Sequence, residues 1–322
     1  MVIAEKELYA ECKLCPNECK VDRTKGQKGR CGQTDKVKIA WCGLHRGEEP
    51  PVSGKNGSGM IFFCGCPLHC AYCQNYQIST ADGAGIFVSV DELSNIMCEL
   101  QKFGAATLNL VTGTHYIPSV IKALEKAKEN GFSLPVVWNS SGYESTEALR
   151  LIDPYIDLYL IDVKTLDSCV ASKFCGLEKY ASSIIPVMKF LKRRHPVTDL
   201  EKGLDGILVR HLVFPGTLDA TLEFLNWYAD NLKDCSYLSL MTQFVPPKEN
   251  PGFKKISDKE YKLLSDTVDK LGIDGFIQER SDNEILWIPD FNKIQPFPEG
   301  FADVLPYFAD LKNDDLKKSC RT

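Results

Sequence analysis

Short apolar segments alternate with amphipathic segments along the chain from residue 60 to about residue 244. In the amphipathic segment 117–130, Val120 and Leu124 lie on one stripe and Lys122 on another, as in a helix with one buried face. Strands that alternate with helices at this spacing predict parallel β-α-β units and an α/β fold. Six such units are too few for an eight-stranded barrel, and on periodicity alone a flat, doubly wound sheet is the alternative. The predicted strands are 60–64, 106–112, 135–139, 156–163, 206–213 and 237–244, and the clearest helices are 91–103, 117–130, 144–152 and 217–232.

The first 58 residues lack this periodicity and are rich in cysteine, glycine and basic residues. Cys12, Cys15, Cys19 and Cys31 follow the spacing C-x2-C-x3-C-x11-C. Four thiols on turn-rich backbone are a good tetrahedral zinc site or a complete ligand set for an iron–sulfur cluster. The spacing does not decide between these two metals, and reduced free cysteines in a loop are the remaining alternative.

The composition divides the chain into three predicted parts. Residues 1–58 form a cysteine-rich metal-binding segment that ends in a linker, since residues 48–59 are rich in Gly, Pro and Ser and predict a loop. Residues 59–280 form the α/β domain. Residues 281–322 form a Pro- and aromatic-rich extension that we expect to pack over the domain, because so many aromatic side chains rarely stay in water.

Three further cysteines follow the first predicted strand directly, and they are the most informative feature of the chain. Cys66, Cys70 and Cys73 follow the spacing C-x3-C-x2-C. A cubane iron–sulfur cluster takes four thiolates, so three would leave one iron open for a small ligand, as a catalytic zinc keeps one open position. A structural zinc knuckle or three unrelated buried thiols are the alternatives. Cys64 is a possible fourth ligand, which would close the cluster.

The composition of the chain argues against several classes of protein. The chain has 322 residues, of which 44% are apolar and 25% charged, as in a globular protein with a sizeable core. Its net charge of −5 argues against nucleic-acid binding. It contains no signal-peptide pattern and no uncharged apolar run of about 18 residues, so we expect no membrane span. Fourteen cysteines without a secretory signal favour metal binding in a reducing cytoplasm.

The residues around Cys66 also carry a family resemblance. Cys66, Cys70, Tyr72 and Cys73 resemble the signature of the radical S-adenosylmethionine (SAM) superfamily, and residues 12–79 resemble its pyruvate formate-lyase activating enzyme-like group. The resemblance implies a [4Fe–4S] cluster whose open iron binds the amino and carboxylate groups of SAM. It implies reductive cleavage of SAM to a 5′-deoxyadenosyl radical that abstracts a hydrogen atom. It also implies an open (β/α)6 partial barrel, which the six predicted units fit.

Polar residues recur where the predicted strands end, and active sites of parallel barrels gather at the C-terminal ends of strands. Alternation places Asp162 and Lys164 on one strand face, where their opposite charges can pair. Arg210 stands in an apolar strand and needs an anionic partner, either the SAM carboxylate or an acid of the barrel. The superfamily's Gly-Gly-Glu-like segment after the second strand is absent here, so Thr112 and Thr114 would replace its Glu. The residues expected at the SAM site are Tyr72, Thr112, Gly113, Thr114, Asn139, Ser140, Asp162, Lys164, Arg210 and Gln243.

The resemblance implies an oxidoreductase that activates a glycyl-radical enzyme by abstracting hydrogen from a glycine of a protein partner. Modification of another peptide or of a small molecule is the alternative, and a second is an electron carrier that holds iron–sulfur clusters without SAM. The expected partners are SAM, a protein or peptide substrate and a reducing electron donor such as flavodoxin or ferredoxin. The residue that performs the hydrogen chemistry on the substrate is not identified by the sequence.

Overall fold

The computed structural model describes residues 5–80, 83–247, 256–279 and 288–319. Its main feature is a curved sheet whose parallel strands follow one another in chain order. Consecutive parallel strands are joined by crossovers of the same hand, so the connecting helices lie on one face of the sheet. The parallel strands are β2 (Ser58–Phe63), β4 (Leu108–Val111), β5 (Val136–Ser140), β6 (Leu158–Asp162), β7 (Gly206–Leu212), β8 (Tyr237–Met241) and β9 (Gly275–Ile277).

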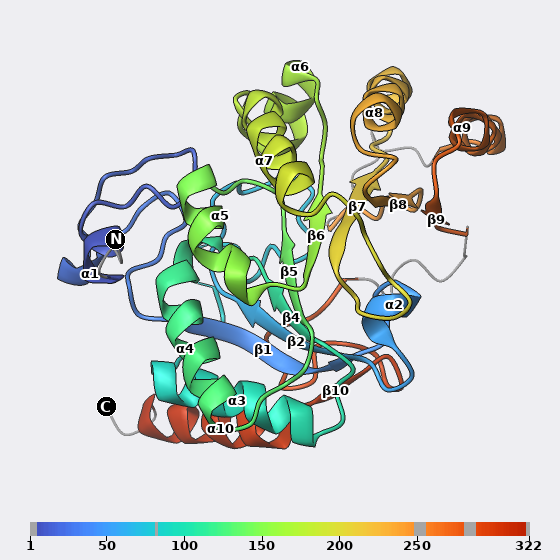
Figure 1. The fold of residues 1–322 in the computed structure, drawn as a ribbon. Helices are drawn as coiled ribbons and strands as arrows, with labels where there is room; N and C mark the ends of the chain where they lie inside the picture. The colour runs from blue at the N-terminus through green and yellow to red at the C-terminus, as the bar shows by residue number, and fades with distance from the viewer. Residues whose placement is uncertain (1–4, 81–82, 248–255, 280–287, 320–322) are drawn as a thin grey trace.

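This topology is the predicted α/β partial barrel, and the doubly wound alternative is wrong. A doubly wound sheet reverses its strand order at a switch point and carries helices on both faces. The described parallel strands show no such reversal, and the helices wrap around the outside of the curved sheet (Figure 1). β9 is a parallel strand that the sequence analysis missed. The main helices are α3 (Val90–Lys102), α4 (Ile117–Glu129), α5 (Thr146–Ile152), α7 (Tyr180–Arg194), α8 (Leu218–Asn231) and α9 (Asp258–Leu271).

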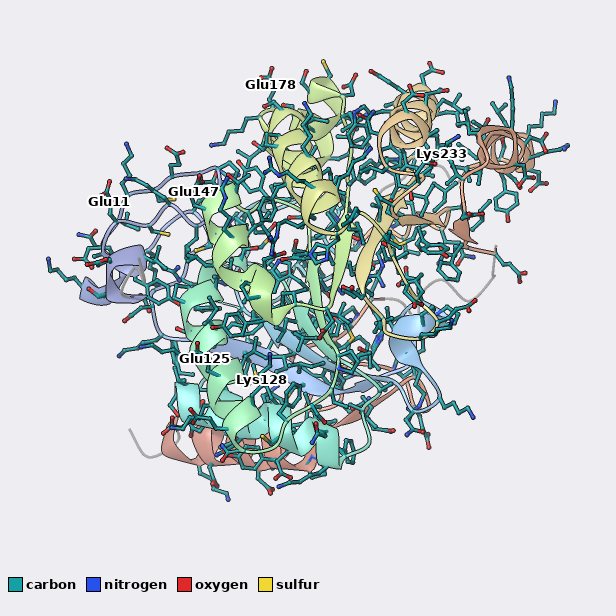
Figure 2. The ribbon with its side chains drawn as sticks, in the orientation of Figure 1. Glu11, Glu125, Lys128, Glu147, Glu178 and Lys233 are labelled. Atoms are coloured by element: carbon teal, nitrogen blue, oxygen red, sulfur yellow. The ribbon has the colours of Figure 1, made fainter. Side chains whose placement is uncertain are left out.

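The six predicted strands and four predicted helices are all present, with ends that differ by a few residues. α3 begins close to its predicted start because a capping box satisfies its first N–H groups: Ser89 Oγ accepts from the N–H of Glu92 (3.1 Å), and Glu92 Oε2 accepts from the N–H of Ser89 (2.7 Å). Glu125 and Lys128 of α4 are exposed and lie on the outside of the molecule (Figure 2). The amphipathic pattern thus located the buried helix face correctly.

The N-terminal segment also contributes a strand that the sequence analysis missed. β1 (Lys38–His45) pairs antiparallel with β2 and with β10 (Ala302–Val304), and β3 (Ile86–Phe87) pairs with the start of β1. Residues 39–45 of β1 are all buried, so the strand lacks the polar–apolar alternation that marks a half-exposed strand. Cys42 is completely buried within this strand.

The loop predicted for residues 48–59 is wrong in part. Pro50 and Pro51 begin a short helix, α2 (Pro50–Ser53), and β2 already starts at Ser58. Proline is favoured at the first helical position, where its missing N–H would be unpaired anyway. α2 places the completely buried Val52 in a small apolar cluster with inward-facing strand residues. The other buried members of this cluster are Val137, Leu158, Leu160, Leu204 and Leu208.

The aromatic extension packs over the barrel, as predicted, in its described part from residue 288 onward. The Phe297 ring lies 5.0 Å from Trp41 and 4.8 Å from His45, both on β1, and the Phe301 ring lies 4.9 Å from His45. α10 (Pro306–Ser319) then lies against α3 (Figure 1). The predicted boundary between residues 280 and 281 lies outside the described residues, so the division into three parts remains a prediction. No described helix is both long and apolar enough to cross a membrane.

Replacing Phe297 with alanine should lower the free energy of unfolding by about 3–5 kcal/mol, because a buried ring is lost from a well-packed aromatic cluster. Chemical denaturation measures the loss. Phe87→Ala is the matched control, since the Phe87 ring is 61% exposed and its removal should change stability little. Equal effects of the two substitutions would show that the extension does not depend on Phe297 for its packing.

Candidate active site

The three-cysteine loop follows β2 and is folded by its own backbone hydrogen bonds. The N–H of Gly65 donates to the carbonyl of Ile78 (2.7 Å), and the N–H of Cys73 donates to the carbonyl of Cys70 (3.2 Å). Gly65 has a φ of +84°, a conformation that glycine adopts without strain. The loop also contacts η4 (Ala171–Cys175), a π-helical turn after β6, where the N–H of Ala71 donates to the carbonyl of Phe174 (3.0 Å).

Burial is the main influence on the pKa values of Cys66 and Cys73. It raises the pKa of Cys66 to about 11 and the pKa of Cys73 to about 12, while the positive charge of Lys164 lowers both. Metal ligands must be thiolates, so iron would have to supply the charge that ionises these groups. Within the described residues, no three His, Cys, Asp or Glu side chains lie close enough together to hold a single metal ion. In a cubane cluster each of these thiolates would bind a different iron.

Cys64 belongs to the core rather than to this loop. Its thiol donates to the carbonyl of Ala84 (3.4 Å), and a Cβ on Gly85 would lie only 2.4 Å from its sulfur. Burial raises the pKa of Cys64 to about 12, and the charges that oppose this shift belong to Lys38 and Lys312. None of the three loop cysteines influences it. The role of Cys64 as a fourth cluster ligand therefore has no support from its surroundings.

Cys175 is a neighbour of the loop that the sequence analysis missed. A hydrogen bond with the Cys175 thiol, together with burial, raises the pKa of Cys70 well above its ordinary value. Cys175 ends η4 and is completely buried. It is an isolated cysteine far along the chain, and no spacing pattern could have linked it to Cys70.

The predicted ion pair between Asp162 and Lys164 is confirmed, with Lys164 Nζ 2.6 Å from Asp162 Oδ2. Lys164 Nζ also lies 5.9 Å from the centre of the Tyr72 ring, so the loop and the end of β6 meet here. Burial lowers the pKa of Lys164, but Asp162 and Cys70 raise it by more, and the lysine stays charged. Asp162 Oδ1 is buried without a hydrogen-bond partner among the described residues. A bound molecule with a donor group would satisfy this oxygen.

Arg210 has anionic partners within the chain. Its Nε donates to Glu49 Oε1 (2.8 Å), and its Nη2 donates to Glu48 Oε2 (2.6 Å) and to Glu49 Oε2 (2.5 Å). Arg210 is therefore paired with acids of the barrel, one of its two predicted kinds of partner. Its contact with SAM remains a prediction. The sequence analysis missed both glutamates because it placed residues 48–59 in an external loop.

Two asparagines complete this group inside the barrel. Asn109 and Asn139 each donate to Glu48 Oε2, at 3.2 and 3.5 Å. Asn139 therefore faces the interior, as predicted for a residue near the site. We call the buried group the lumen cluster, and its members are Glu48, Glu49, Asn109, Asn139 and Arg210.

Other predicted SAM contacts lie apart from the lumen. Ser140 follows Asn139 on β5 and faces the opposite side, where its Oγ accepts from the N–H of Gly142 (3.1 Å). Thr114 donates to the buried Glu144 (2.7 Å), a carboxylate that also accepts from Trp138 Nε1 (3.3 Å) on the helix-facing side.

The three remaining predicted SAM contacts lie at strand ends. Thr112 has a φ of +58° and its N–H donates to the carbonyl of Asn139 (2.9 Å), next to Gly113. The N–H of Gln243 donates to Gln278 Oε1 (3.1 Å) just after β8. The structure thus brings Tyr72, Asp162 and Lys164 to the cysteine loop and places Ser140 and Thr114 elsewhere.

The N-terminal cysteines lie beside the same loop. Asn17 Nδ2 donates to the carbonyl of Pro67 (2.9 Å), and Arg30 Nη2 donates to the carbonyl of Leu68 (3.2 Å). Burial raises the pKa of Cys15 to about 12, and the charges of Cys12, Cys31 and Cys19 raise it further. The four thiols are therefore close enough to interact electrostatically.

The chain is similar to several known proteins. The family model of the radical SAM superfamily matches residues 60–242. The chain is 28% identical over 284 residues to an "Uncharacterized protein" of Methanocaldococcus jannaschii, covering 84% of this chain and 77% of that protein. It is 26% identical over 224 residues to a "Putative glycyl-radical enzyme activating enzyme" of the same organism, covering 65% of this chain and 79% of that protein. The chain also matches a solved structure, that of Streptococcus suis SuiB bound to S-adenosylmethionine, with a TM-score of 0.47 and 13% identity. The match covers 70% of this chain and 50% of SuiB, so the chain spans about half of SuiB.

Gly65→Ala should lower both stability and the capacity of the loop to retain iron. A left-handed non-glycine residue costs about 1–2 kcal/mol. In addition, the new Cβ would lie 2.6 Å from the carbonyl oxygen of Cys31. Gly131→Ala is the matched control, because Gly131 has a φ of +85° but open space around it. Iron content after anaerobic reconstitution and the free energy of unfolding measure the effect, and equal results for the two variants would contradict a steric role.

Arg210→Met should lower the free energy of unfolding by about 3–5 kcal/mol, because Glu48 and Glu49 would stay buried without their cation. Adding Glu48→Gln and Glu49→Gln should restore much of the loss. Arg150→Met, which breaks an exposed pair with Glu147, is the control and should have little effect. If Arg210→Met instead leaves stability unchanged and weakens SAM binding, Arg210 acts on the cofactor and the lumen cluster is not structural.

Proposed function

Since the chain belongs to the radical SAM superfamily, we propose that it holds a [4Fe–4S] cluster on Cys66, Cys70 and Cys73 and cleaves SAM reductively to a 5′-deoxyadenosyl radical. When bound, such a cluster supplies one electron and an open iron for SAM. The observation that carries the proposal is the loop itself. Its three thiols follow the first strand of the matched region, and the half-buried Lys164, just after β6, lies beside the Tyr72 ring of the same loop.

The chain's own residues would hold SAM and offset charge around the loop. Lys164 lies between Asp162 and the loop thiols, so its ammonium would offset the negative charge of bound thiolates. Asp162 Oδ1 is free to accept a hydrogen bond from an amino or hydroxyl group of SAM. Asn139 and Arg210 would act on the site indirectly, because their side chains hold Glu48 and Glu49 in the lumen cluster. Thr112, Gly113 and Gln243 remain proposed contacts at the strand ends.

Aromatic side chains would keep water from the reaction. The Tyr72 ring lies 4.5 Å from the Phe214 ring and 6.3 Å from the Phe174 ring, and Phe174 and Phe214 stack at 4.4 Å. Together they form an apolar wall beside the loop. A dry site protects a reactive radical from side reactions, which is the contribution that a protein makes to cofactor chemistry of this kind.

We propose a protein partner as the substrate, with hydrogen abstraction from a glycine that becomes a glycyl radical. The similarity to a protein named as a glycyl-radical enzyme activating enzyme supports this choice over other peptides and small molecules. A one-electron donor such as flavodoxin or ferredoxin would reduce the cluster.

Anaerobic reconstitution with iron and sulfide, followed by SAM and dithionite, should yield 5′-deoxyadenosine. Cys66→Ala, Cys70→Ala and Cys73→Ala should each abolish this product, because two remaining thiolates hold a cluster poorly. Cys64→Ala is the matched control and should retain activity, since its thiol contacts Ala84 rather than the loop. Full turnover in any of the three loop variants, or loss of turnover in Cys64→Ala, would contradict the assignment.

A further inference from the structure

The N-terminal cysteine module, residues 12–34, is held together by backbone hydrogen bonds among its own residues. The N–H of Cys12 donates to the carbonyl of Val21 (3.1 Å), and the N–H of Lys20 donates to the carbonyl of Cys12 (3.0 Å). Glu18 and Lys20, on either side of Cys19, have φ values of 42° and 55°. Left-handed backbone at such residues is strained and persists only where the surroundings require it. The module therefore holds Cys19 in a defined orientation.

The thiols of this module and of the catalytic loop share a local geometry. In the loop, Cys66 accepts a hydrogen bond from the N–H of Leu68 (3.5 Å), two residues further along the chain. The same i to i+2 contact recurs at other cysteines of both sets. The pairs are Cys73 with Asn75 in the loop, and Cys15 with Asn17 and Cys31 with Gln33 in the module. Cys19 instead accepts from the N–H of Arg30 (3.3 Å). Hydrogen bonds to sulfur stabilise and tune cluster thiolates.

A buried cation accompanies the module. Arg23 is completely buried, and its guanidinium donates to the backbone carbonyls of Gln33, Thr34 and His115. Its carbon Cζ lies 4.8 Å from the centre of the Tyr9 ring. No carboxylate of the described residues pairs with it. Carbonyl dipoles offset only part of the cost of a buried charge, which is several kcal/mol for an ion without a counter-ion.

The guanidinium of Arg23 lies beside the segment that carries Cys31, since it contacts the carbonyls of Gln33 and Thr34. An arginine guanidinium stays protonated in proteins, and Cys31 and Cys12 are close enough to interact with its charge. Four thiolates around iron would form a net anion beside this cation. The arrangement parallels that of Lys164 at the catalytic loop, which lies beside thiols in the same way.

We propose that Cys12, Cys15, Cys19 and Cys31 hold a second iron–sulfur cluster, in which every iron has a cysteine ligand, and that Arg23 is its buried counter-charge. A cluster is favoured over one zinc ion because the module repeats two features of the catalytic loop, namely N–H contacts to sulfur and a nearby cation. With no open iron, this cluster would not bind SAM. The inference does not depend on the proposed reaction.

The test uses the full chain with Cys66, Cys70 and Cys73 replaced by alanine, so that only the module can hold metal. After anaerobic reconstitution with iron and sulfide, this variant should contain one cluster per chain, visible by absorbance and, after dithionite reduction, by electron paramagnetic resonance. Adding SAM should leave that resonance unchanged. A chain that binds zinc without sulfide, that binds no metal, or whose resonance changes with SAM would overturn the assignment.

The role of Arg23 is tested in the same background by its reduction potential. Arg23→Met and Arg23→Gln should shift the potential to more negative values and lower iron retention, because a nearby positive charge favours the reduced cluster. Arg23→Gln removes the charge but keeps an amide that can donate to the carbonyls. Arg23→Lys keeps the charge, so its reduction potential should equal that of the parent. Arg150→Met is the control for loss of an arginine at the surface. Equal reduction potentials in all four variants and the parent would show that Arg23 only donates hydrogen bonds to backbone carbonyls and does not act on the cluster.

Discussion

Arg210 places a positive charge in the barrel interior, and two carboxylates from the segment before β2 pair with it. This interaction connects β7 to the opposite side of the barrel, because Glu48 and Glu49 lie just before α2 and β2. It also orders the polar interior. Asn109 and Asn139 donate to Glu48, and His45 Nδ1 lies 3.7 Å from Glu48 Oε1. Buried charges are tolerated only with partners, so the packing of the lumen depends on this group.

The lumen cluster also links the sheet to the C-terminal extension. His45, at the end of β1, contacts Glu48 on one side and the rings of Phe297 and Phe301 on the other. Burial lowers the pKa of His45, more strongly than Glu48 raises it, so the imidazole is neutral at pH 7. A neutral ring can pack against the aromatic side chains without adding a further buried charge. The extension thus covers the edge of the barrel at β1, and His45 connects it to Glu48 of the lumen cluster.

Both sulfur-rich segments follow one physical rule. Each places several thiols in buried surroundings that raise thiol pKa values, as at Cys66 and Cys15. Each also provides N–H donors to sulfur and a buried cation, Lys164 at the loop and Arg23 at the module. Such surroundings disfavour free thiolates and accommodate thiolates that a metal has ionised. The two segments touch through Arg30, which contacts residues 68 and 69 of the loop.

The sequence by itself determined the features that depend on local spacing. Periodicity located six of the parallel strands and four of the main helices, cysteine spacing located both thiol sets, and alternation predicted the Asp162–Lys164 pair. It could not locate β1, whose continuous burial removes any periodic signal. Only the tertiary structure decided which distant residues meet, such as Glu48 with Arg210 and Cys70 with Cys175. Local spacing follows from the helix and strand repeats, whereas contacts between distant segments depend on how all elements pack together.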